Sequence, residues 1–315
     1  MSKIAKHIAR GIGGLLALAS VVWIVIRFMQ TGVLTQISSS AHFERLASHV
    51  ALAIPVYAAG LCFAGLAWCC LQAAFLPIQP RWRLLFRAYA TTQFAKYLPG
   101  NVGHYIGRHM LLRKLGMSHW ALLMASLGEA GSLVLASLVW AASAMGVLLP
   151  WLTVSLAAWQ VLVVECVCLA LAFVCLQWVR KHNSRVRAWV PLHKPSWLLP
   201  VLPLQLILFA AMALALMTPA YVLLHNAEDV WLLPAAAAAS WVAGFLVVGA
   251  PAGIGVREMI FLALLHGHMP EPDILLLAAA FRLITFGGDV VVLLTGLLLR
   301  GGLTASMDEK VRAME

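Results

Sequence analysis

The sequence predicts an all-α, polytopic membrane protein: a helical bundle of about six full spans plus two re-entrant broken helical hairpins in an inverted repeat, with both termini cytoplasmic. The 315-residue chain is 63% hydrophobic and only 11% charged. Several of its apolar runs exceed roughly 18 residues, and they lack the alternation of barrel strands. Because lipid offers backbone groups no partner, such runs must cross as helices.

Six segments are predicted to cross in full, and each is bounded by proline, glycine or clustered charges. They are residues 8–28, 49–76, 119–148, 153–178, 199–224 and 273–299. The first follows a basic leader like that of a signal peptide, but its apolar run continues to Ile26. We therefore expect it to be an uncleaved span.

Two further segments, 84–113 and 231–267, are interrupted by proline and glycine. Each half of the first is about ten to fifteen residues, short of the roughly 20 that a crossing needs. Both of its flanks are basic, which by the positive-inside rule predicts entry from the cytoplasm and return to it. Acidic residues flank the second segment, so it is expected to dip in from outside, although a full crossing by residues 231–249 stays open.

An internal repeat relates these two segments. Placing Pro99 over Pro251 aligns "PGNVG" with "PAGIG". This predicts a first repeat over about 5–148 and an inverted second repeat over about 153–300, within a single membrane domain, 1–315. Broken helices at matching positions of inverted repeats are typical of transporters, whose substrate sites lie where the breaks meet.

The residues around both breaks have the chemistry of an anion site. A half-helix starting at Asn101 would place His104, Tyr105 and Arg108 on one face, beside unpaired N–H groups at the positive end of the helix dipole. Glycines allow an anion to approach the backbone closely. The predicted substrate-binding residues are Lys96, Asn101, His104, Arg108, Gly253, Gly255 and Arg257.

Other ionisable residues fall inside apolar segments, where each charge costs roughly 2.5–3.5 kcal/mol on insertion scales. Those predicted to gate the site or carry a proton are Glu129, Glu258, Arg282 and Asp289. The alternative is structural pairing, for example of Glu129 with Arg282. Arg257 and Glu258 are adjacent and point in different directions, so each is expected to have its partner elsewhere. Glu165 is a weaker candidate.

Several function classes lack support in the sequence. It has no Walker loop, nucleophile elbow or HExxH motif, and no long polar segment that could form a soluble catalytic domain. All six cysteines lie in apolar runs, as expected of buried thiols. "HGHMPEPD" is expected to be a solvated turn and not a metal site. We expect no enzyme activity, no metal, no cofactor and no nucleic-acid partner.

The segments "KYLPGNVGHYIGR" and "PAGIGVRE" resemble the flippase-like membrane domain of lysylphosphatidylglycerol synthases, over roughly residues 5–300. This chain would be a stand-alone member without the cytoplasmic aminoacyl-transferase domain. The resemblance implies lipid translocation, and "APAG" departs from the Pro-Gly-Gly run that the family often has. The matching positions are Lys96, Pro99, Gly100, Gly103, Arg108, Gly253, Gly255, Arg257 and Glu258.

The leading hypothesis is a flippase or transporter in the cell (inner) membrane. Its substrate would be an anionic, phosphate-bearing lipid, a glycolipid or a polyprenyl-linked lipid. A second hypothesis is an intramembrane enzyme acting on a lipid phosphate, with His104 as acid/base. A third is an accessory subunit of a membrane glycosyltransferase or lipid-modifying enzyme.

Overall fold

The structure is a computed structural model. Apart from isolated positions, it describes residues 40–76, 82–97, 102–114, 116–142, 192–223, 232–247 and 253–299. These residues form helices and short turns, with no β-strand among them. The predicted spans 8–28 and 153–178 lie outside the described residues except at isolated positions. The described residues also exclude Pro99, Gly100, Asn101, Glu165 and Pro251.

Within the described ranges, four helices are long and apolar enough to cross a membrane. They are α3 (Ser40–Phe75), α6 (His119–Ala142), α10 (Val201–Leu223) and α13 (Glu271–Leu298), with a short 3₁₀ helix, η2 (Pro195–Leu198), before α10. They coincide with four of the predicted spans. The protein is therefore a membrane-embedded helical bundle.

The first broken segment consists of α4 (Trp82–Gln93), the 3₁₀ helix η1 (Phe94–Tyr97) and α5 (Gly103–Lys114). The start of α5 lies two residues after the one expected. Arg108 on α5 donates from Nε to the Thr92 hydroxyl on α4 at 3.3 Å, so the two helices fold back on one another. With 12 residues, α5 spans about 18 Å, well short of a hydrocarbon core of about 30 Å.

The second broken segment consists of α11 (Leu232–Leu246) and α12 (Val256–Leu265). The turn before α12 needs glycine, because Gly253 and Gly255 have φ angles of 69° and 85°. A Cβ on Gly253 would also lie 2.8 Å from the Cα of Gly244 on α11. The turn is therefore packed backbone to backbone against α11. With 15 residues, α11 spans about 22 Å.

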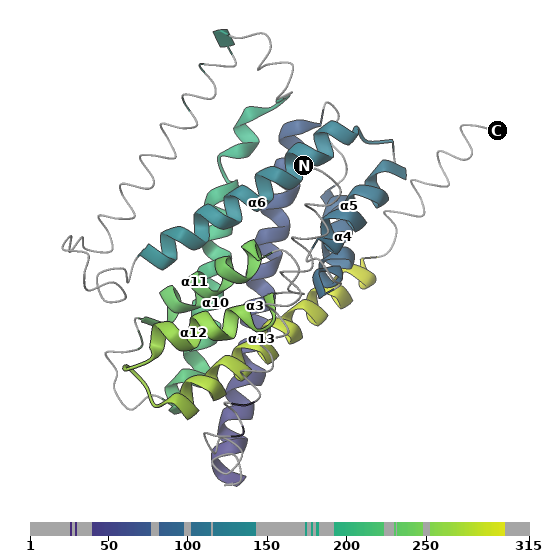
Figure 1. Ribbon diagram of the computed structural model, residues 1–315. Helices are drawn as coiled ribbons and strands as arrows, with labels where there is room; N and C mark the ends of the chain where they lie inside the picture. The colour runs from purple at the N-terminus through teal and green to yellow at the C-terminus, as the bar shows by residue number, and fades with distance from the viewer. Residues whose placement is uncertain are drawn as a thin grey trace.

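Helix α3 runs through the bundle, and small residues let its neighbours approach it (Figure 1). Gly60 of α3 faces Ala211 of α10, and Gly288 of α13 faces the Tyr57 ring. In the view of Figure 1, α4 and α5 lie on one side of α3 and α11 and α12 on the other.

Candidate functional site

A cavity with about 490 Å³ of empty space lies among the helices, and both broken segments line it. Lys96 and His104 come from the first segment, and Arg257 comes from the second. Glu129 of α6 and Tyr57 of α3 also contribute polar groups to its wall. Residues predicted to bind substrate from two distant parts of the sequence therefore face one space.

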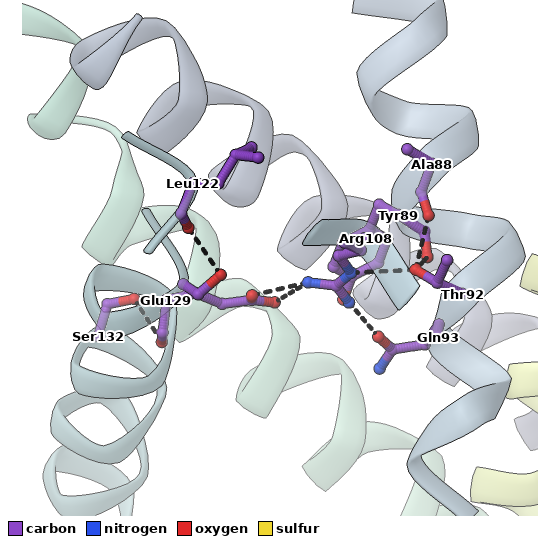
Figure 2. Close-up of polar contacts among 9 residues, drawn as sticks. Ala88, Tyr89, Thr92, Gln93, Arg108, Leu122, Glu129 and Ser132 are labelled. Atoms are coloured by element: carbon purple, nitrogen blue, oxygen red, sulfur yellow. Dashed lines mark hydrogen bonds and ion pairs between the residues drawn. The ribbon is translucent and has the colours of Figure 1, made fainter. Parts of the chain in front are cut away.

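Glu129, which lines this cavity, forms an ion pair with Arg108. Figure 2 shows the pair and its neighbours. Arg108 Nη1 donates to both carboxylate oxygens, at 2.8 and 2.7 Å, while Nη2 donates to Gln93 Oε1 at 2.5 Å. Arg108 is 1% exposed and Glu129 is 2% exposed. With Thr92 bound to Nε, every nitrogen of the guanidinium has a protein partner, and Arg108 is not among the residues lining the cavity.

Aromatic rings enclose the Arg108 guanidinium as well. Its carbon Cζ lies 4.1 Å from the centre of the Tyr89 ring and 5.2 Å from that of Trp68. The face of an aromatic ring attracts a cation, most strongly where water is excluded. Arg108 therefore holds α3, α4, α5 and α6 together, which favours the structural alternative for this arginine.

A second ion pair connects the first hairpin to α13. Lys96 Nζ lies 2.8 Å from Oδ1 and 2.7 Å from Oδ2 of Asp289, and the Tyr97 hydroxyl donates to Oδ2 at 2.7 Å. Asp289 is fully buried, whereas the Lys96 side chain is 15% exposed and reaches the cavity. The charge of Lys96 is thus compensated from outside the cavity.

A third ion pair connects the second hairpin to the same helix. Glu258 pairs with Arg282 and accepts a hydrogen bond from the Gly255 N–H at 2.7 Å. Arg282 also donates to the Gly253 carbonyl at 3.0 Å. The structural pairing of Glu129 with Arg282, given above as an example, is therefore wrong. Glu129 pairs with Arg108 of the first broken segment, and Arg282 pairs with Glu258 of the second. Glu258 does have a partner elsewhere, as expected.

The three ion pairs include Lys96, Arg108 and Arg282 but not Arg257, the fourth base predicted at membrane depth. It forms no ion pair with any residue in the described ranges, and its Nε is buried without a hydrogen-bond partner. Its guanidinium carbon lies 5.6 Å from the centre of the Trp241 ring. Arg257 also lines a second cavity of about 250 Å³, together with Glu258 and Arg282. One uncompensated cation thus borders both spaces.

Two further polar groups of the first cavity have no partner. The Nδ1 atom of His104 and the hydroxyl of Tyr105 are buried without a hydrogen bond. Buried polar groups in native proteins are nearly always bonded, so such atoms beside a cavity mark places where a ligand or water can bind. His104 therefore faces the same space as Arg257.

Some lining residues were missed by the sequence reasoning. Gln93, Tyr89 and Trp241 all line the cavity. Tyr89 and Trp241 lie in apolar stretches where an aromatic residue is most simply explained by core packing. Gln93 carried a usable signal, because it follows two threonines just before the predicted break.

The sequence matches no protein-family model and no curated protein. The resemblance to the membrane domain of lysylphosphatidylglycerol synthases therefore stays an expectation that rests on its two motifs.

Proposed function

We propose that this protein is a transporter that moves a lipid with an anionic headgroup between the membrane leaflets. The observation that carries the proposal is Arg257, a cation without a counter-ion at the wall of a cavity between two broken helices. Arg257 is half-buried with its Nε removed from solvent, so leaving its charge without a counter-ion is costly. A phosphate-bearing headgroup would supply the missing charge and accept the free N–H groups.

The arrangement of the helices supports transport. The α-helices of both broken segments have 10 to 15 residues, fewer than the roughly 20 that a crossing needs. Irregular backbone at membrane depth is tolerated only where it lines a cavity or is buried in protein. We infer that both segments re-enter and that they are the matching elements of an inverted repeat. With this inference, the proposed topology is the one that the sequence predicts: full spans and two re-entrant segments in an inverted repeat.

Helix α13 would couple the two hairpins during transport. Arg282 and Asp289 are seven residues apart on it, so they lie on one face about 10 Å from each other. Asp289 holds the first hairpin through Lys96, and Arg282 holds the second through Glu258. Alternate opening of these two pairs would expose the cavity first to one leaflet and then to the other.

The test measures how fast phosphatidylglycerol with a fluorescent acyl chain moves between the two leaflets of proteoliposomes that contain the protein. We expect Arg257→Gln to slow exchange by roughly tenfold or more, since loss of a charged partner in a desolvated site costs about 2–5 kcal/mol. Lys114→Gln is the matched control, because Lys114 is an exposed base at the end of α5. Equal rates for the two variants would refute the proposal.

The enzyme hypothesis keeps one supporting observation. The unpartnered Nδ1 of His104 faces the same cavity as Arg257, so an acid/base and an anion-binding group would meet at one phosphate. Mass spectrometry of a lipid phosphate after incubation with the protein decides between the two functions. A product of changed mass that disappears in His104→Gln would favour the enzyme, and unchanged lipid favours transport.

A further inference from the structure

The charges around the cavity specify its ligand further than the proposed function does. Four bases and three carboxylates are predicted to lie at membrane depth near the two breaks: Lys96, Arg108, Arg257, Arg282, Glu129, Glu258 and Asp289. Three ion pairs use all three carboxylates. The balance leaves one positive charge, on Arg257.

The side chains of Gln93 and Arg257 present to this cavity hydrogen-bond donors without partners among the described residues. A guanidinium has only N–H groups, so the atom of Gln93 that bonds to Arg108 must be the oxygen. The Gln93 side-chain NH₂ group is therefore the end without a partner in the described ranges, as Figure 2 shows for the residues drawn. Gln93 also lines the cavity. Arg257 adds further donors at the same wall.

The carboxylates, by contrast, are committed to protein cations. Glu129 is the carboxylate among the described residues that line this cavity, and both of its oxygens accept from Arg108. Asp289 accepts from Lys96 and Tyr97. A ligand ammonium group would therefore meet no uncompensated negative charge here.

An aromatic cage is the other way to bind a cation, and the cavity does have aromatic walls. Protein cations already lie over three of these rings, however. Arg108 lies over Tyr89 at 4.1 Å and over Tyr105 at 5.8 Å, and Arg257 lies over Trp241 at 5.6 Å. A ligand cation would have to approach two guanidinium groups, which repel it.

We infer that the headgroup taken by this cavity is a phosphate ester rich in hydrogen-bond acceptors and without a free ammonium group. The inference rests on the proposed function and narrows its substrate class. It also differs from what the family resemblance implies, because an aminoacylated lipid carries ammonium groups.

Two lipids with the same acyl chains test this, phosphatidylglycerol and its lysyl ester. Native mass spectrometry of the whole protein in detergent measures the occupancy of each. We expect phosphatidylglycerol to bind tighter by roughly tenfold or more, because like charges juxtaposed in a site cost several kcal/mol. Equal or tighter binding of the lysyl ester would overturn the inference.

Added glycerol 3-phosphate distinguishes a site for the phosphate ester alone from one that needs the lipid. Displacement of phosphatidylglycerol would assign the recognition to the headgroup, and retention would assign it to the complete lipid. Either outcome supports the inference if the lysyl ester binds more weakly than phosphatidylglycerol. If neither lipid loses occupancy in Arg257→Gln, the proposed function fails instead.

The substitution Lys96→Met supplies the converse test. It leaves the Asp289 carboxylate without its counter-ion beside the cavity. We expect the ratio of phosphatidylglycerol to lysyl ester to fall by roughly tenfold or more relative to the native protein. An unchanged ratio in a folded variant would contradict the role given to charge compensation.

Discussion

Replacing either partner of the Arg108–Glu129 pair is expected to lower the free energy of unfolding by about 3–5 kcal/mol. Arg108→Met leaves a buried carboxylate without a counter-ion, and Glu129→Leu leaves a buried guanidinium in the same state. The large effect follows from burial, since both residues are at most 2% exposed. It does not require the pair itself to be strongly stabilising, because the cost comes from the charge that remains.

The double substitution Arg108→Met with Glu129→Leu is expected to recover most of this loss. Apolar replacements of a whole buried pair are often neutral or stabilising, because no charge is left behind. Unfolding in mixed micelles, followed by circular dichroism, measures all three variants. Lys114→Met is the control and should change the free energy by less than about 0.5 kcal/mol, since Lys114 is exposed. Additive losses in the double variant would contradict the explanation.

The sequence singled out these ionisable residues as candidates but could not pair them. Lys96 and Asp289 are separated by 193 positions, and nothing local in the sequence connects them. Glu129 illustrates the difficulty, because two arginines were available at similar depth. The pairing depends on which helix faces lie against each other, a property of the whole bundle. For the same reason, the sequence could not single out Arg257 as the base without a counter-ion.

The broken helices were predictable for local reasons. Proline and glycine interrupt both segments, and the first has halves too short to cross, so a hairpin follows from length and backbone geometry. Glu258 is also locally determined, because it caps the Gly255 N–H three residues before it. By contrast, Trp241 and Tyr89 could not be separated from ordinary core residues. A ring beside a cavity and a ring inside a core have the same sequence signal.

The sequence could not predict that Gly244 lies close to Arg257, because the two residues belong to different helices. This contact leads to a second functional prediction. Gly244 lies on α11, and a Cβ there would overlap the Cγ of Arg257 and lie 2.8 Å from its Nε. The atoms in the way belong to a flexible side chain, so Arg257 can move aside. Gly244→Ala is therefore expected to displace the guanidinium from its present place in the cavity wall while the bundle stays folded.

We expect Gly244→Ala to slow lipid exchange by about as much as Arg257→Gln does, roughly tenfold or more. Stability should be kept, because alanine in a helix interior is favoured over glycine by about 1 kcal/mol. Proteoliposome exchange and thermal unfolding of the same preparations measure the two effects. Gly131→Ala is the matched control, since a Cβ on Gly131 meets no atom within 4 Å.

The combination of Gly244→Ala with Arg257→Gln separates this explanation from general damage to α11. If the glycine acts only by making room for Arg257, the double variant should be no slower than Arg257→Gln alone, because residues that share one interaction are not additive. A further loss would mean that Gly244 serves a second purpose, such as its backbone contact with Gly253. Native exchange in Gly244→Ala would show that the position of Arg257 does not control transport.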